Sequence, residues 1–361
     1  MAMTIVESTR LVTGGVDTHA DVHVAAAVDG NGGVLGVESF ATTSAGFGAL
    51  HGWLAGFGAL ARVGVEGTGA YGAGLARYLR ARDLEVIEVD RPNRQLRRRA
   101  GKSDTIDAIE AARAALSGRA SGIAKTADGD VEAIRVLLVA RRSGRDVRIK
   151  YLNQIRHLGF TAPDELRERL RGVPAEHLAR TAASLRPALA AGPVLHATKL
   201  AIRTLGRRVL DLEAEAQHLD QLIDELVRRT APSLLDVHGV GTHTAATLLV
   251  AAGDNPHRLK SEAAFAHLCG VAPLPASSGK VIRHRLNPGG NRQANHALWR
   301  IVFTRMNSDE RTRKYVARRL AEGLTTREVM RVLKRYVARE LYPHLVRTYK
   351  IWSDGPGPRT A

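Results

Sequence analysis

A seven-residue apolar repeat constrains the fold of this chain more than any other feature of its sequence. Two sets of apolar residues each recur every seven positions within residues 202–226, and the sets are offset by three. The first set is Ile202, Val209, Ala216 and Ile223, and the second is Leu205, Leu212, Leu219 and Leu226. This spacing puts both sets on one side of a helix, as the seam of a coiled coil requires. It predicts a coiled coil or a helical hairpin, with one helix of an intramolecular bundle as the alternative.

The first 90 residues alternate between strand and helix patterns. Valines typical of strands and the glycine-rich turn at residues 29–33 predict two strands joined by a hairpin turn within residues 11–40. Residues 34–40 are expected to continue as a third strand. The segments expected next are a helix at 44–61, a strand at 62–66, a helix at 72–82 and a strand at 84–89. Three antiparallel strands followed by alternating helix and strand are the order of an RNase H-like α/β domain.

The rest of the chain has helical patterns, so the predicted fold class is α/β plus α. Helices are expected at residues 104–116 and 131–158, and Thr325 and Glu328 have the spacing of a capping box that opens a basic helix. The expected domains are an α/β domain with a basic helical extension (1–158), a helical or coiled-coil region (159–231), a helical C-terminal domain (232–350) and a disordered tail (351–361).

The charge of the chain is strongly positive and unevenly distributed. It has 53 Lys and Arg against 36 Asp and Glu, a formal charge of +17, which indicates a polyanionic partner. Residues 256–350 hold 20 basic and six acidic side chains, whereas residues 1–60 hold one basic and five acidic. Acidic residues gathered at one end of a basic chain are expected to have a function of their own.

Four carboxylates stand at positions suited to metal binding. Asp17 lies in the first strand, Glu66 ends the strand at 62–66, and Asp104 and Asp107 lie three apart on one face of a helix. Hard oxygen ligands of this kind suit Mg²⁺ or Mn²⁺, and phosphodiester chemistry uses such ions. The alternative is that each acid is a helix cap or a solvated group, which fits Asp104 best. His19 is expected to pack or to be solvated rather than to bind metal.

Taken together, these motifs resemble a known family. Asp17-Thr18-His19, Val65-Glu66-Gly67-Thr68-Gly69 and the segment from Lys102 to Ala108 resemble the DEDD motif of bacterial insertion-sequence transposases of the IS-one-ten type. Relatives of that family include the Piv DNA invertases and the bridge-RNA-guided recombinases. The resemblance implies a RuvC-like N-terminal domain, a coiled-coil region, and a C-terminal transposase domain that carries a serine nucleophile.

The serine implied by the resemblance lies in a loop rich in proline and glycine. Ser278 matches the Ser-Gly pair that follows prolines in the family, and Ser277 is the alternative. A serine hydroxyl needs a base or a metal for activation, and nearby basic side chains can hold the scissile phosphate. The candidates for this contact are Lys280, Arg283, Arg285 and Asn291. From composition alone, an ordinary Ser-Gly turn would be the simpler interpretation.

Two further segments are predicted to contact nucleic acid. Residues 235–241 have the apolar-Gly-apolar-Gly pattern of a helix-hairpin-helix, in which Gly239 and Gly241 would let backbone amides approach a phosphate. The second segment precedes the Asp104 helix, and its basic residues include Arg94, Arg97, Arg98, Arg99 and Lys102.

The resemblance implies a DNA transposase that forms a phosphoserine intermediate. Its partners would be DNA and a guide RNA, and the coiled coil would join protomers into a dimer or tetramer. Three other functions remain open: a RuvC-like nuclease or junction resolvase that uses water, an actin-like sugar kinase, and a DNA-binding protein without catalysis. The absence of a second phosphate-loop pattern like that of the Glu66 segment and the charge of +17 count against the kinase.

Cysteine content and hydropathy bear on the cellular location. The single cysteine, Cys269, rules out an intramolecular disulfide and zinc fingers built on cysteine. No apolar run approaches the roughly 20 residues of a membrane span, and no export signal is recognisable. We therefore expect a cytoplasmic protein, associated with the nucleoid and not with a membrane.

The basic segment yields a first prediction. Neutralising Arg94, Arg97 and Arg98 together should flatten the dependence of log K for nucleic-acid binding on log salt by about three units at most, because each lost phosphate contact releases one fewer counterion. Fluorescence anisotropy across a salt series measures this slope. An unchanged slope would show that the segment is a solvated loop.

Overall fold

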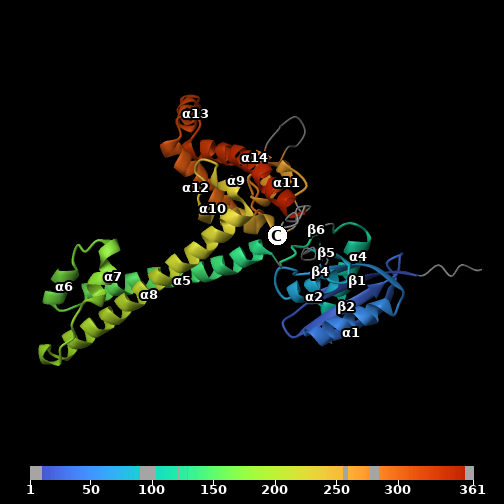
Figure 1. The fold of residues 1–361 in the computed structure, drawn as a ribbon, viewed down its shortest axis with the longest axis horizontal. Helices are drawn as coiled ribbons and strands as arrows, with labels where there is room; N and C mark the ends of the chain where they lie inside the picture. Colours follow the sequence, from blue (N-terminus) through green and yellow to red (C-terminus); the bar gives the residue numbers. More distant parts are fainter. Residues whose placement is uncertain are drawn as a thin grey trace, which may run out of the picture. The chain divides into compact units, whose positions relative to one another are not determined.

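The computed structural model describes residues 10–89, 103–120, 122–127, 129–254, 259–276 and 284–353. Its helices and strands are shown in Figure 1. The chain divides into two compact units, of which the first comprises residues 1–129, 252–268 and 349–361 and the second comprises residues 130–251 and 269–348. None of the helices in this described part of the chain is both long and apolar enough to cross a membrane.

The first unit is built on one mixed sheet. Its strands are β1 (Leu11–Thr18), β2 (Val22–Val28), β3 (Val34–Ala41), β4 (Ala59–Glu66), β5 (Glu85–Val89) and β6 (Gly122–Ile123). They lie in the order β3-β2-β1-β4-β5-β6. The first three strands pair antiparallel, whereas β4 runs parallel to both β1 and β5. The predicted mixed α/β domain is therefore confirmed, and β6 is an additional edge strand.

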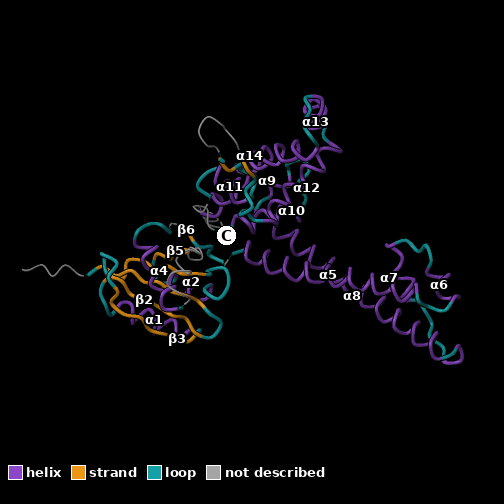
Figure 2. The backbone as a smooth tube through the Cα atoms, turned by 180° about the vertical axis from the view of Figure 1, so that it is seen from behind, coloured by secondary structure: helices purple, strands orange, loops and turns teal. Residues whose placement is uncertain are grey.

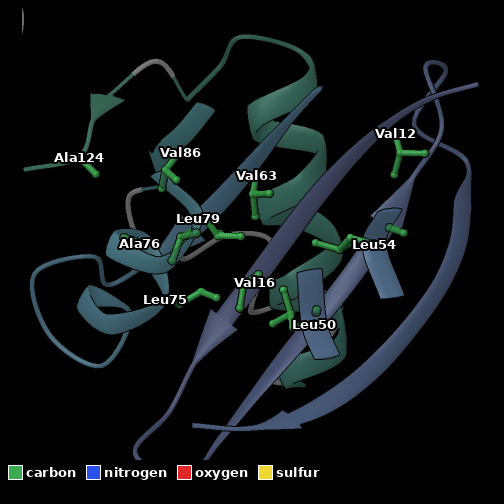
Figure 3. Packing of buried hydrophobic residues seen from close by; sticks show 13 residues of the cluster. Val12, Val16, Leu50, Leu54, Val63, Leu75, Ala76, Leu79, Val86 and Ala124 are labelled. Carbon is green, nitrogen blue, oxygen red and sulfur yellow. The ribbon is translucent and has the colours of Figure 1, made fainter. Parts of the chain in front are cut away.

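One face of the sheet carries the main apolar core. Helices α1 (Ser44–Ala55) and α2 (Ala73–Arg80) cover this face with Leu50, Leu54 and Leu79, which pack on Val16 and Val63 (Figure 3). All five side chains are fully buried. Because side chains alternate along a strand, the residues next to Val16 in β1 and next to Val63 in β4 point to the opposite face of the sheet.

The opposite face is covered by α4 (Asp104–Leu116), which touches the strand backbone directly. A Cβ atom on Gly15 would lie 2.1 Å from the backbone nitrogen of Ala112, and one on Gly64 would lie 2.5 Å from the carbonyl oxygen of Ala111. Any side chain at either glycine would displace the helix. Glycine in neighbouring strands and alanine on the helix therefore set how closely α4 approaches the sheet.

The helix predicted at residues 44–61 was wrong at its C-terminal end. Helix α1 stops at Ala55, and residues 59–61 already belong to β4. Gly58 has a φ of +148°, and a Cβ there would lie 2.3 Å from the carbonyl oxygen of Arg10. Ala59 donates its N–H to the same oxygen over 2.8 Å, so pairing with the chain before β1 ends the helix early.

The second unit contains a long helical hairpin. Helices α5 (Asp130–Phe160) and α8 (Pro193–Thr230) lie side by side (Figure 2). The segment that joins them contains α6 (Asp164–Leu170), α7 (Ala175–Ala183) and the short 3-10 helix η1 (Leu189–Ala191). The basic helix that the sequence assigned to the first domain belongs, as α5, to the second unit.

The heptad residues of α8 pack within the chain. Ile202 and Val209 are fully buried in a cluster with Ile155 of α5 and Ala182 of α7. The structure thus has the helical hairpin that the repeat predicted as one of its alternatives. Leu212 and Leu219 remain half-buried along the seam.

The remaining helices of the second unit form its C-terminal part. They are α9 (Pro232–Leu235), most of α10 (Thr242–Ala252), α12 (Arg292–Ser308), α13 (Glu310–Ala321) and nearly all of α14 (Thr326–Ser353). The predicted capping box is confirmed, because Thr325 and Glu328 exchange hydrogen bonds at the start of α14. This helix continues to Ser353, so the tail predicted from residue 351 was placed too early. Residues 354–361 lie outside the described residues.

The first unit also includes a segment from far along the sequence. Residues 252–268, with helix α11 (Glu262–Leu268), belong to it by their contacts. The carboxylate of Asp254 accepts a hydrogen bond from the backbone N–H of Ala127 over 3.0 Å. Gly253 has a φ of +94° and lies against the side chain of Lys125. The first unit is therefore discontinuous in sequence.

The contact between α4 and the sheet yields a prediction. Gly15→Ala should lower the free energy of unfolding by about 1–3 kcal/mol, because the added methyl group overlaps the backbone of α4. Gly52→Ala is the matched control, since a Cβ at Gly52 meets nothing within 4 Å. In the helix interior that control should gain about 0.5–1 kcal/mol. Denaturant titration measures both, and equal midpoints for Gly15→Ala and the unmodified chain would contradict the contact.

Candidate metal centre and nucleic-acid-binding surfaces

Two of the four predicted carboxylates follow the glycines on which α4 rests. Asp17 comes two residues after Gly15 in β1, and Glu66 comes two residues after Gly64 in β4. The register pairs Gly15 with Gly64 and Val16 with Val65, so the two acids end neighbouring strands on the face of α4. The hydroxyl of Thr18 donates to the carbonyl oxygen of Glu66 over 2.8 Å and ties the two strand ends together.

The other two carboxylates come from the first turn of α4. Asp104 and Asp107 precede the alanines of this helix that lie on the strand glycines. Asp107 is buried, with 4% of its surface exposed, whereas the side chain of Asp104 is about half exposed. Ser103 makes no side-chain capping hydrogen bond, so a capping role does not account for this helix start.

His19 joins this group. Its Nε2 atom lies 3.1 Å from Oδ2 of Asp17 and 3.5 Å from Oδ2 of Asp104. One ligand atom each of Asp17, His19 and Asp104 can be chosen so that all lie within 4.8 Å of one another. Among the described residues, Glu66 and Asp107 are not part of this closest set. The sequence prediction that His19 only packs or is solvated missed this contact, although Asp-Thr-His at a strand end was the available signal.

Electrostatics at Asp17 favour a bound cation. Burial raises the pKa of the Asp17 carboxyl above its ordinary value. Its neighbour His19 lowers that pKa, and the negative charges of Asp107 and Asp104 raise it again. A carboxylate that is disfavoured by burial and by like charges gains stability from a nearby cation. The donor set of carboxylate oxygens and one imidazole nitrogen therefore fits a divalent metal ion.

A polar cavity opens beside these residues. It has a volume of about 580 Å³ and is lined by Asp104, by Ser103 and by Ser39 of β3 among others. Of the four carboxylates, Asp104 is the one that lines this cavity and is open to solvent there.

Several predicted site residues lie outside the described residues. These are Ser277, Ser278, Lys280, Arg283, Arg94, Arg97, Arg98, Arg99 and Lys102. The strands on either side of the serine segment are β7 (Leu274–Pro275) and β8 (His284–Arg285), which pair antiparallel. Arg285 is exposed at this pair.

In the turn predicted to be a helix-hairpin-helix, one of the two glycine amides expected to approach phosphate is already hydrogen-bonded within the chain. Gly239 has a φ of +81°, and a Cβ there would lie 3.2 Å from the carbonyl oxygen of Ile301, so glycine is needed for contact with α12. The N–H of Gly241 donates to the hydroxyl of Thr244 over 3.0 Å. Within the turn, therefore, the amide of Gly241 already has a partner in the chain.

Arginine side chains gather beside this turn instead. Gly239 and Gly241 line a cavity of about 560 Å³ together with Arg141, Arg142, Arg145 and Arg300. Arg141 makes two hydrogen bonds to Asp220, at 2.9 and 3.0 Å, so part of this charge is balanced. Burial and then the charge of Arg141 lower the pKa of His243 in this cavity, which favours the neutral imidazole. Sequence inspection missed these arginines because they come from α5 and α12.

Asn291 has a structural role. Its side-chain oxygen accepts hydrogen bonds from the backbone N–H groups of Gln293 and Ala294, both over 3.0 Å, and so caps the start of α12. Its contact with nucleic acid remains a prediction.

Comparison with known proteins identifies relatives of both halves of the chain. Residues 14–158 match a family model of DEDD transposases of the IS110 (IS-one-ten) type, described as transposase, and residues 231–317 match the transposase IS116/IS110/IS902 family. An insertion element IS110 uncharacterized 43.6 kDa protein from Streptomyces coelicolor is 37% identical over 110 residues, which are 30% of this chain and 27% of that protein. An insertion element IS900 uncharacterized 42 kDa protein from Mycobacterium paratuberculosis is 28% identical over 145 residues, 39% of this chain and 36% of that protein. The chain thus covers about a third of the length of these relatives.

The carboxylate cluster predicts a thermal response to metal. Mg²⁺ or Mn²⁺ at about 100 times its Kd should raise the free energy of unfolding by about 2.7 kcal/mol and raise Tm by several degrees. Asp17→Asn should abolish this shift. In metal-free buffer at neutral pH it should raise Tm, because a raised pKa means that the charged carboxylate destabilises the folded chain.

Asp83→Asn is the matched control for this experiment. Asp83 is exposed in the same unit, and asparagine tolerates its φ of +58°. Differential scanning fluorimetry with and without metal measures both variants. A metal shift in Asp17→Asn as large as that in Asp83→Asn would remove Asp17 from the ligand set.

Proposed function

We propose that this chain, which belongs to the IS110-type family of DEDD transposases, cuts and rejoins DNA strands. The observation that carries the proposal is the cluster of Asp17, His19 and Asp104, whose ligand atoms lie within 4.8 Å of one another in the part of the chain that matches the DEDD family. Such a cluster suits phosphodiester chemistry, and the charge of +17 suits a nucleic-acid substrate.

In the proposed reaction, the hydroxyl oxygen of Ser278 attacks a phosphodiester. A bond forms between this oxygen and phosphorus, and the bond from phosphorus to the oxygen of the leaving strand breaks. The hydroxyl of a second strand then attacks the phosphoserine, which restores a phosphodiester and frees the serine. The number of phosphate ester bonds is conserved, so rejoining needs no external energy.

The remaining residues position the phosphate and neutralise its charge. A divalent cation held by Asp17 and Asp104, with Glu66 and Asp107 beside them, would help to activate the serine and stabilise charge on the phosphoryl oxygens. Lys280, Arg283 and Arg285 would hold the strand near the serine. The arginines next to Gly239 and Gly241 would contact the DNA backbone, as would the basic segment from Arg94 to Lys102.

Two partners extend the proposal. The family resemblance supports a structured guide RNA, and the basic character of residues 256–350 is compatible with binding both RNA and DNA. Recombination joins at least two DNA duplexes, which supports a dimer or tetramer. Because Leu212 and Leu219, like Leu205 and Leu226, are only half-buried in the hairpin, these seam residues are available to a second protomer.

A nuclease or junction resolvase that uses water is the second candidate function. The carboxylate cluster favours it, because Asp17, His19 and Asp104 make up a metal-binding set without the serine. Water would then attack the phosphodiester and leave free strand ends, with no bond between protein and DNA.

The covalent intermediate separates these two functions. Trapping the reaction on a nicked substrate and digesting with trypsin should yield peptide 261–280 bonded to nucleotide, with fragmentation assigning the bond to Ser278. Ser278→Ala should lose both the adduct and recombination, while Ser278→Cys should retain a trace of the adduct. A bond on Ser277 would move the assignment by one residue and keep the mechanism. Full DNA cleavage by the Ser277→Ala, Ser278→Ala double variant would instead establish the water-using enzyme.

A further inference from the structure

A second basic cavity lies in the C-terminal part of the second unit. Its volume is about 780 Å³, and it is formed by the segments that flank β7 and β8 together with α12 and α14. The basic side chains that line it are Arg285, Arg292, Arg331, Lys334 and Arg335. None of its described lining residues is acidic. A cavity with this lining is electrostatically complementary to an anion.

The wall of this cavity is held by close backbone contact. A Cβ on Gly290 would lie 2.3 Å from both the Cα and the nitrogen of Gly270, so the two chain segments cross where neither has a side chain. Asn295 donates to the carbonyl oxygen of Cys269 over 2.9 Å. Its own side-chain oxygen accepts from Nζ of Lys334 over 2.8 Å. Lys334 is therefore fixed to the wall of the cavity.

Apolar residues line much of the rest of the cavity, beside Asn287 and Asn295. They include Val271, Pro273, Leu286, Pro288, Val332 and Tyr336. Leu286 and Tyr336 are 62% and 51% exposed, which leaves them accessible to a ligand. An edge contact with Tyr315, at 6.1 Å between ring centroids, holds the tyrosine ring.

We propose that this cavity binds one unstacked nucleotide of a single DNA strand, with its phosphate at Lys334 and Arg331 and its base against Tyr336. A phosphate needs the basic side chains, and a planar base needs the apolar ones; a nucleotide has both in one ligand. The proposal rests on the proposed function, because Pro273 and Arg285 of the lining flank the predicted serine segment in sequence.

The environment of Lys334 agrees with this assignment. Burial, and then the charge of Arg331, lower the pKa of the Lys334 ammonium. A phosphate at this position would offset the repulsion between the two cations. The low aromatic content of the chain, 4%, is compatible with a single base-binding tyrosine and not with an extended stacking platform.

Photo-crosslinking tests which residue contacts the base. The full chain, without divalent metal, is irradiated with single-stranded DNA that carries 5-iododeoxyuridine at one position at a time. Trypsin cuts after Arg335 and Arg339, so a base on Tyr336 should appear on peptide 336–339. Crosslinks confined to other peptides would overturn the proposal. A crosslink of this peptide to RNA of the same sequence, with none to DNA, would also overturn the proposal.

Binding measurements test the phosphate contact. Lys334→Ala should weaken binding of the DNA strand by about tenfold and reduce the salt slope by about 0.7, the value for one single-strand phosphate. Lys334→Arg should retain the slope. Lys314→Ala, which removes the same charge from an exposed lysine of α13, should leave both values nearly unchanged. Equal effects of Lys334→Ala and Lys314→Ala would overturn the contact.

Two further comparisons keep the result interpretable. If Lys334→Ala fails to fold by circular dichroism, Arg331→Ala replaces it, because Arg331 is exposed and its loss disturbs packing less. Neither crosslinking nor binding requires cleavage. A crosslink on peptide 336–339 without any Ser278 adduct would therefore support this inference and count against the proposed function. A Ser278 adduct without that crosslink would support the proposed function and count against this inference.

Discussion

The candidate metal centre depends on the contact between α4 and the bare backbone of two neighbouring strands. Gly15 and Gly64 supply no side chain, so alanines of the helix lie directly on β1 and β4. Two residues later each strand has an acid on the same face, and the first helical turn supplies two more. Small residues at this contact thus place the acids of β1, β4 and α4 at the same end of the two strands. Without that contact the acids would be solvated separately and would have no reason to share a cation.

The two units offer opposite electrostatic environments. In the first, burial and neighbouring carboxylates raise the pKa of Asp17, which favours a cation. In the second, burial and nearby arginines lower the pKa of His243 and of Lys334, and the cavities around these two residues favour an anion. A phosphodiester carries negative charge and reacts more readily when a metal ion neutralises part of it. The distribution of charge along the chain therefore fits the proposed strand cleavage, with the cation-favouring and anion-favouring groups in separate parts of the chain.

Local sequence patterns predicted most of the helices and strands, whereas the errors arose where contacts with residues distant in sequence determine the structure. Strands with alternating valines and helices with apolar faces lie close to their predicted positions, and two of the four predicted acids, Asp17 and Asp104, lie in one cluster with His19. The end of α1 was missed because it depends on the carbonyl of Arg10. The pattern at residues 131–158 predicted the helix α5 but not that α8 packs along it. The arginines beside Gly239 could not be assigned, because they come from α5 and α12 and meet this turn only in the folded chain.

The discontinuity of the first unit has a consequence for how the protein is made. A ribosome releases the sheet and α4 well before residues 252–268, which belong to the same unit. Until that segment emerges, the amide of Ala127 lacks the acceptor that Asp254 provides. Domains commonly fold in order as they leave the ribosome, N-terminal first. Here the N-terminal unit must stay incomplete while the helical hairpin is synthesised, so a nascent chain that ends before residue 252 cannot complete the unit that carries the clustered acids.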